Sequence, residues 1–156
     1  LPGCDVHVHR EEIVSAKTGA DSGVFEDEVA GSDQWRLQSE EYEVAPGITA
    51  INTPGHTAGH MSLFIELPRG RPVILCGDAA DLQENLMDEI APGYCWQDND
   101  ALAVASIRKL NEMARVEDAD LADRRARHDL SRLSAPHLVV GGHDADSQLA
   151  GGIGHD

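Results

Sequence analysis

Two apolar runs of strand length, joined by a turn, constrain the fold of this chain more than any other feature. The first run is MSLFIEL at residues 61–67, the turn is PRGRP at 68–72, and the second run is PVILCGD at 72–78. The second run is apolar without interruption, as is typical of a strand that is buried on both faces of its sheet. The pair therefore predicts two strands, the second of them inside a covered sheet.

After these strands the hydrophobic period changes to that of a helix. In DALAVASIRKLNEMARV, residues 100–116, the apolar positions recur at helical spacing, and Asp98 or Asn99 is a suitable N-cap. This stretch therefore predicts an amphipathic helix of about four turns. The stripe that is expected to face the core contains Leu102, Ser106, Leu110 and Met113, with Ile107 and Ala114 beside it.

The segments before residue 61 carry weaker patterns. Alternation over Asp5–His9 predicts a short strand that leads into a polar helix. Residues 17–40 are acidic and contain several glycines, which indicates a loop or a weak helix. YEVAPGITAINTP, residues 42–54, predicts two short strands around a Pro46-Gly47 turn.

The C-terminal part of the chain is less regular. Residues 118–136 are charged and show no clean period, whereas residues 138–140 predict a strand that ends in a Gly-Gly turn. Residues 147–156 have the composition of a flexible tail. With no internal repeat, the sequence predicts a single domain over residues 1–146.

Charge and cysteine content exclude several classes of function. The chain has 156 residues with 28 acidic against 12 basic side chains, a net charge of −16 that repels phosphate backbones and anionic lipids. We therefore expect neither nucleic-acid nor membrane binding. Cys4, Cys76 and Cys95 are odd in number and include no Cys-x-x-Cys pair, which argues against a disulfide framework and favours the cytoplasm.

Three predicted strands end in a histidine or an aspartate. The ends are TPGHTAGH at residues 53–60, CGDAAD at 76–81 and VVGGHD at 139–144. Such strand ends are where α/β sheets gather their sites. Imidazole and carboxylate without thiolate suit Zn²⁺ or a similar ion that keeps one position open for water. The combination predicts a hydrolytic metal site.

In this order and spacing, the TPGH…GH, GDAAD and GHD segments resemble the metallo-β-lactamase superfamily. The stretch from YEVAPG to KLNEMA is most similar to its N-acyl homoserine lactonase branch, the quorum-quenching lactonases. The resemblance implies an α/β fold, the metallo-β-lactamase-type αββα sandwich, of which this chain corresponds to the C-terminal half. It also implies two zinc ions and a metal-dependent hydrolase that opens the ring of a small-molecule lactone.

The resemblance also implies roles for individual residues. His56 would bind one zinc ion, Asp78 would bridge both and act in catalysis, and His143 would bind the second. His60 would support the loop that carries His56. Glycines 55 and 59 would let that loop pack closely, because a Cβ at either position would intrude.

The chain also departs from the family pattern. The His-x-His-x-Asp-His ligand motif is absent, and we expect His7 and His9 of HVHREE to be ordinary strand residues. Where well-known lactonases carry a tyrosine, three residues after the bridging aspartate, this chain has Asp81. Tyr94 is the nearby alternative, to which we assign no role.

Several alternatives stay open on the sequence alone. Residues 118–136 read as an insertion or a frameshifted stretch, and their His128 competes with His143 as the last ligand, although a strand directly precedes only His143. Asp78 has a second interpretation as the N-cap of a turn. The alternative functions are a glyoxalase II-like thioesterase and a non-catalytic remnant or binding module, and lack of activity in this fragment is a further alternative. The oligomeric state is undetermined.

Overall fold

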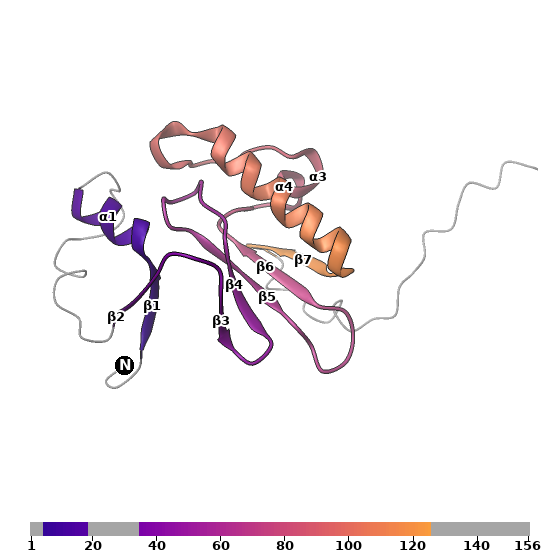
Figure 1. The fold of residues 1–156 in the computed structure, drawn as a ribbon. Coiled ribbons are helices and arrows are strands. Elements are labelled where there is room, and N and C mark those ends of the chain that lie inside the picture. The colour runs from indigo at the N-terminus through magenta and orange to yellow at the C-terminus, as the bar shows by residue number, and fades with distance from the viewer. Residues whose placement is uncertain (1–4, 19–34, 126–156) are drawn as a thin grey trace, which may run out of the picture.

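A five-stranded sheet forms the centre of the part that the computed structural model describes, residues 5–18 and 35–125 (Figure 1). The first four strands of this sheet are antiparallel, and the fifth runs parallel to the fourth. In spatial order the strands are β3 (Tyr42–Ala45), β4 (Ile48–Asn52), β5 (Met61–Ile65), β6 (Val73–Gly77) and β7 (Asp120–Asp123).

The strands predicted on either side of the two turns are confirmed. Gly47 joins β3 to β4 with φ of 76°, a left-handed conformation that suits glycine. Strands β5 and β6 pair in register from Leu63 opposite Leu75 to Ile65 opposite Val73. In β6, Val73 and Ile74 point to opposite faces of the sheet and are both buried, which agrees with the uninterrupted apolar sequence of this strand.

Helix α4 (Asp100–Glu117) covers one face of this sheet, with the short helix α3 (Gln83–Asp88) beside it (Figure 1). Asn99 is the N-cap, and its side chain accepts a hydrogen bond from the Leu102 amide at 3.1 Å. The buried face of α4 is rotated slightly from the predicted stripe, since Leu102 and Met113 are only partly buried. Its buried residues are Ala103, Ser106, Ile107, Leu110 and Ala114.

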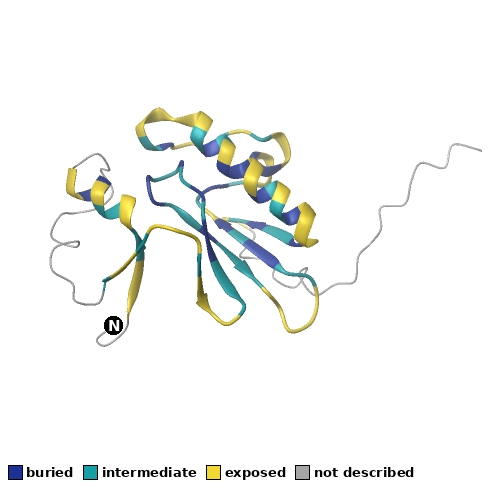
Figure 2. Ribbon diagram, in the orientation of Figure 1, coloured by how far each residue is buried: buried dark blue, intermediate teal, exposed yellow. Residues whose placement is uncertain are grey.

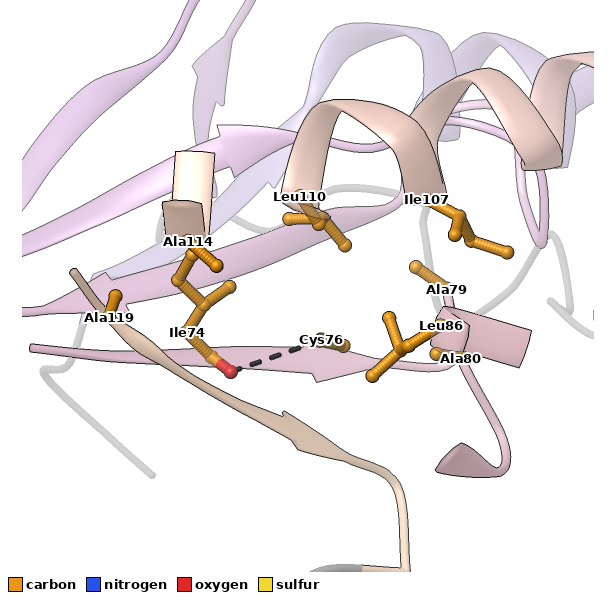
Figure 3. Close-up of a cluster of buried hydrophobic side chains, with 9 residues drawn as sticks. All are labelled: Ile74, Cys76, Ala79, Ala80, Leu86, Ile107, Leu110, Ala114 and Ala119. Carbon is orange, nitrogen blue, oxygen red and sulfur yellow. Dashed lines mark hydrogen bonds between the residues drawn. The ribbon is translucent and has the colours of Figure 1, made fainter. Parts of the chain in front are cut away.

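The core lies between α4 and β6 (Figure 3). Ile74, Ile107 and Leu110 are fully buried, and each such side chain contributes about 1.5–3 kcal/mol through burial. Burial raises the pKa of the Cys76 thiol to about 12, so this cysteine is a small apolar packing residue, as predicted. Figure 2 shows the buried stripe of α4 facing buried positions of the sheet.

A two-stranded parallel sheet and one helix precede the central sheet in the chain. Strand β1 (Val6–His9) leads into helix α1 (Arg10–Thr18), as predicted, and β1 pairs with β2 (Trp35–Gln38). The prediction of loop or weak helix for residues 17–40 was therefore wrong at Trp35–Gln38. This short segment pairs through its backbone with β1, a tertiary contact that local composition does not encode.

Residues 118–136, whose sequence shows no clean period, contain a strand near their start. Asp120–Asp123 form β7, because backbone pairing with β6 and burial of Ala119 and Ala122 outweigh the charge of the segment. The predicted strand at 138–140, His128, His143 and the tail at 147–156 all lie outside the described residues. Among the helices of residues 5–18 and 35–125, none combines the length and apolarity needed to cross a bilayer.

Candidate active site

The loop between β4 and β5, residues 53–60, is fixed against α4 by close backbone contacts. The Ser106 hydroxyl donates to the Pro54 carbonyl at 2.6 Å, and the Trp96 amide donates to the Gly55 carbonyl at 2.7 Å. Gly55 has φ of 146°, and a Cβ there would lie 2.5 Å from the Ala103 Cα. Only glycine permits this approach of loop to helix, which confirms the prediction for Gly55.

The far end of the same loop is held by helix α1. The Gly59 amide donates to Glu12 Oε2 at 2.8 Å, and a Cβ on Gly59 would lie 2.6 Å from the Glu12 amide nitrogen. The prediction for Gly59 is thus confirmed as well. Helix α1 also accepts a bond from the Trp96 indole through the Ser15 hydroxyl at 3.1 Å. Helix α1 and the region of residues 96–106 therefore hold this loop from two sides.

His60 connects the loop to the end of β6. Its Nε2 accepts a hydrogen bond from the Asp78 amide at 3.2 Å, so in the neutral ring the proton is on Nδ1. Nδ1 lies 3.1 Å from the Thr53 carbonyl and 2.9 Å from the Thr53 hydroxyl. Burial, followed by the proximity of His56, lowers the pKa of His60 and favours the neutral form. The expected supporting role of His60 agrees with these contacts.

Two buried hydroxyl groups extend the contacts of His60 to the neighbouring strands β5 and β6. The Thr53 hydroxyl lies 2.9 Å from the Ser62 hydroxyl, which donates to the Cys76 carbonyl at 3.0 Å. Three strand ends are thereby joined by polar contacts in a buried environment, where each unsatisfied group would be costly. These buried contacts fix the strand ends next to which His56 and Asp78 lie.

Asp78 directly follows β6, and the left-handed backbone conformation of Gly77 lets the chain turn closely past His60 before it. Gly77 has φ of 59°, and a Cβ there would lie 3.2 Å from His60 Nε2. Helix α3 begins at Gln83 with Leu82 as its N-cap, so Asp78 does not cap that helix.

His56 and Asp78 are brought together although 22 residues separate them in the chain. His56 Nε2 lies 3.7 Å from Asp78 Oδ2, and the two side chains are partly exposed, at 23% and 39%. His56 Nδ1 is buried without a hydrogen-bond partner among the described residues. The Tyr94 ring packs edge-on to His56, with centroids 5.6 Å apart.

Arg124, the residue after β7, contacts the other oxygen of Asp78. Its Nε lies 3.2 Å from Asp78 Oδ1, and its guanidinium also lies 3.4 Å from Asp81 Oδ1. Sequence reasoning did not single out Arg124, because the strand that presents it was not expected. Once β7 is recognised as the parallel neighbour of β6, the residues that follow both strands are expected at one edge of the sheet.

The described residues do not by themselves fit a dinuclear zinc centre. Within residues 5–18 and 35–125, no three histidine, cysteine, aspartate or glutamate side chains are grouped to hold a metal ion. His56 and Asp78 supply two donor side chains, and the guanidinium of Arg124 already contacts Asp78. His7 stacks on Tyr42, and His9 Nδ1 accepts from the Glu11 amide, which agrees with ordinary strand roles.

The fold is α/β of the metallo-β-lactamase type, and the chain corresponds to part of the αββα sandwich. A solved N-acyl homoserine lactone hydrolase with N-hexanoyl-L-homoserine at its catalytic metal centre superposes with a TM-score of 0.68 and 30% identity. That match covers 76% of this chain and 46% of the other. A second quorum-quenching N-acyl homoserine lactone hydrolase gives a TM-score of 0.71 at 28% identity, over 83% and 52% of the two chains.

In sequence, the chain is similar to N-acyl homoserine lactonases. It is 39% identical over 83 residues to an N-acyl homoserine lactonase of a Bacillus species, which is 53% of this chain and 32% of the relative. The chain thus spans about a third of the length of the curated relatives it matches. No family model matches the chain. The resemblance seen in the TPGH…GH and GDAAD segments is confirmed by these comparisons.

Proposed function

We propose that this chain forms part of a metal-dependent hydrolase that opens the ring of N-acyl homoserine lactones. The observation that carries the proposal is the convergence of His56 and Asp78, at 3.7 Å, beside the ends of β4 and β6. The similarity to lactonases in both sequence and structure gives this pair its chemical interpretation.

The proposed cofactor is zinc, two ions in the complete site, with His56, Asp78 and His143 among the ligands. A neutral imidazole and a carboxylate are suitable donors for zinc in hydrolytic sites. Asp78 is the proposed residue at the reaction centre, and the remaining donors must come from outside residues 5–18 and 35–125. When bound, such ions would activate water and polarise the lactone carbonyl.

The proposed location is the cytoplasm, where the free thiols of Cys76 and Cys95 would stay reduced. The proposed substrate is small and neutral, in agreement with the acidic surface of the chain. Ring opening adds water across the acyl carbon–oxygen bond. It gives a hydroxyl, a carboxylate and a released proton.

The test is hydrolysis by the protein expressed from its complete reading frame, with zinc supplied. Release of protons from N-hexanoyl-L-homoserine lactone is followed with a pH indicator, and mass spectrometry checks for the addition of one water. The variants His56→Ala and Asp78→Asn are expected to lose activity, whereas Arg115→Ala, on the exposed side of α4, is expected to retain it. Cleavage of thioesters but not lactones would replace the proposal with a thioesterase.

One observation favours a non-catalytic role for the chain on its own. The guanidinium of Arg124 already lies 3.2 Å from Asp78 Oδ1, an oxygen that a metal ion would otherwise contact. In the same assay, a protein that neither binds zinc nor hydrolyses lactone or thioester would support this second candidate.

A further inference from the structure

The position of Arg124 follows from the parallel pairing of β6 and β7. In this pairing Gly77 lies opposite Asp123, so the next residues, Asp78 and Arg124, emerge at the same edge of the sheet. The Arg124 amide donates to the Ala80 carbonyl at 3.0 Å, which ties its backbone to the turn after Asp78. The guanidinium is therefore directed at this turn by the fold itself.

The two oxygens of the Asp78 carboxylate have different partners. Oδ1 faces the guanidinium at 3.2 Å, and Oδ2 faces His56 Nε2 at 3.7 Å. A second carboxylate, Asp81, lies 3.4 Å from the same guanidinium. One fixed positive charge thus offsets two neighbouring negative charges, as a bound cation would.

Arginine is always protonated, so this charge does not titrate away near neutral pH. A divalent ion that approached Asp78 would meet repulsion from the guanidinium and competition for the carboxylate oxygens. The Arg124 side chain is 56% exposed, so water can replace its contacts if it moves. The guanidinium therefore opposes metal binding at Asp78, but a metal ion can bind if the Arg124 side chain moves into solvent.

We propose that Arg124 occupies the place of a cation at Asp78, so that a divalent metal ion binds His56 and Asp78 only by displacing the guanidinium. The inference rests on the proposed role of these two residues as metal ligands. It accounts for the contacts of a single guanidinium with both carboxylates of this turn.

The experiment compares zinc affinity of the purified 156-residue chain and its variants by competition with a chromophoric chelator. Arg124→Gln is expected to bind zinc about tenfold more tightly than the unmodified chain, because loss of the guanidinium removes both repulsion and competition. Arg124→Lys keeps the charge and is expected to bind as weakly as the unmodified chain. Arg115→Gln, which breaks an exposed ion pair on α4, is the matched control and should change nothing.

Thermal unfolding provides a readout that does not depend on catalysis. Without zinc, Arg124→Gln is expected to melt at a lower temperature than the unmodified chain, since two carboxylates lose their counter-charge. Added zinc should raise the melting temperature of Arg124→Gln more than that of the unmodified chain. Adding His56→Ala to Arg124→Gln should abolish the gain in zinc affinity, which would place the ion at this pair.

The inference is overturned if Arg124→Gln and the unmodified chain bind zinc equally, or if the gain survives His56→Ala. It is also overturned if Arg124→Lys binds as tightly as Arg124→Gln, because charge would then not be the cause. Lactone hydrolysis is scored separately. Turnover with unchanged zinc affinity would retain the proposed function alone, and tighter zinc binding without turnover would retain only this inference.

Discussion

Gly55→Ala is expected to be the most disruptive small substitution in the candidate site. The added Cβ would lie 2.5 Å from the Ala103 Cα, where ordinary carbon contacts are about 3.5–4.0 Å. Either the loop at residues 53–60 or helix α4 must move away. That movement would weaken the hydrogen bonds from Ser106 and Trp96 that fix the loop.

The magnitude of this effect has two parts. Placing a non-glycine residue at φ of 146° costs about 1–3 kcal/mol in backbone strain. Forcing an extra methyl group into a packed contact adds roughly 1–3 kcal/mol. The sum, about 2–6 kcal/mol, is a large share of the ~5–15 kcal/mol by which a folded domain is stable.

Gly70→Ala separates these two parts. Gly70 has φ of 97°, but a Cβ there meets nothing within 4 Å, so this control contains strain without overlap. Urea unfolding of both variants, followed by circular dichroism, gives the difference in free energy of unfolding. We expect Gly55→Ala to be less stable than Gly70→Ala by about 1–3 kcal/mol. Equal stabilities would refute the close approach of loop to helix.

Three further predictions concern the base of the site and the core. Thr53→Val removes a buried hydroxyl shared by His60 and Ser62 and should cost about 1–3 kcal/mol in urea unfolding. Because the pKa of His60 is lowered in the folded chain, the unfolded chain binds more protons below about pH 6.5. Stability should therefore fall as pH decreases from 6.5, and in His60→Gln this slope should be shallower; an unchanged slope would contradict the assignment. Ile107→Ala should cost about 2–5 kcal/mol, against less than about 0.5 kcal/mol for the exposed Val116→Ala, as measured by thermal melts.

The parts of the fold that were predictable from sequence are those with strong local patterns. The strands at Met61–Ile65 and Val73–Gly77 and the helix at Asp100–Glu117 carry periodicities that survive without tertiary information. By contrast, β2 and β7 are four residues each, and their strand state depends on a partner strand. Their own composition, WRLQ and DLAD, contains too few apolar residues to indicate a strand.

The candidate site likewise contains residues that the sequence indicated and one residue that it did not. Loop histidines and an aspartate after a buried strand were visible as strand-end residues, and the family resemblance implied the tight packing of Gly55 and Gly59. Arg124 was not visible, because its role depends on the pairing of β7 with β6 rather than on any neighbour in sequence. Tyr94 was set aside, yet its ring packs against His56.

The His56–Asp78 pair is held in place by contacts of the surrounding scaffold. Contacts from α1, α4 and β6 fix the backbone on both sides of His56, and His60 links that backbone to the Asp78 amide. A site prepared in this way lowers the ordering cost of binding a ligand. In our proposal the charge of Arg124, a single side chain directly after β7, opposes the binding of a metal ion to this pair. Metal affinity and scaffold stability should therefore respond to different substitutions, the first to Arg124 and the second to Gly55.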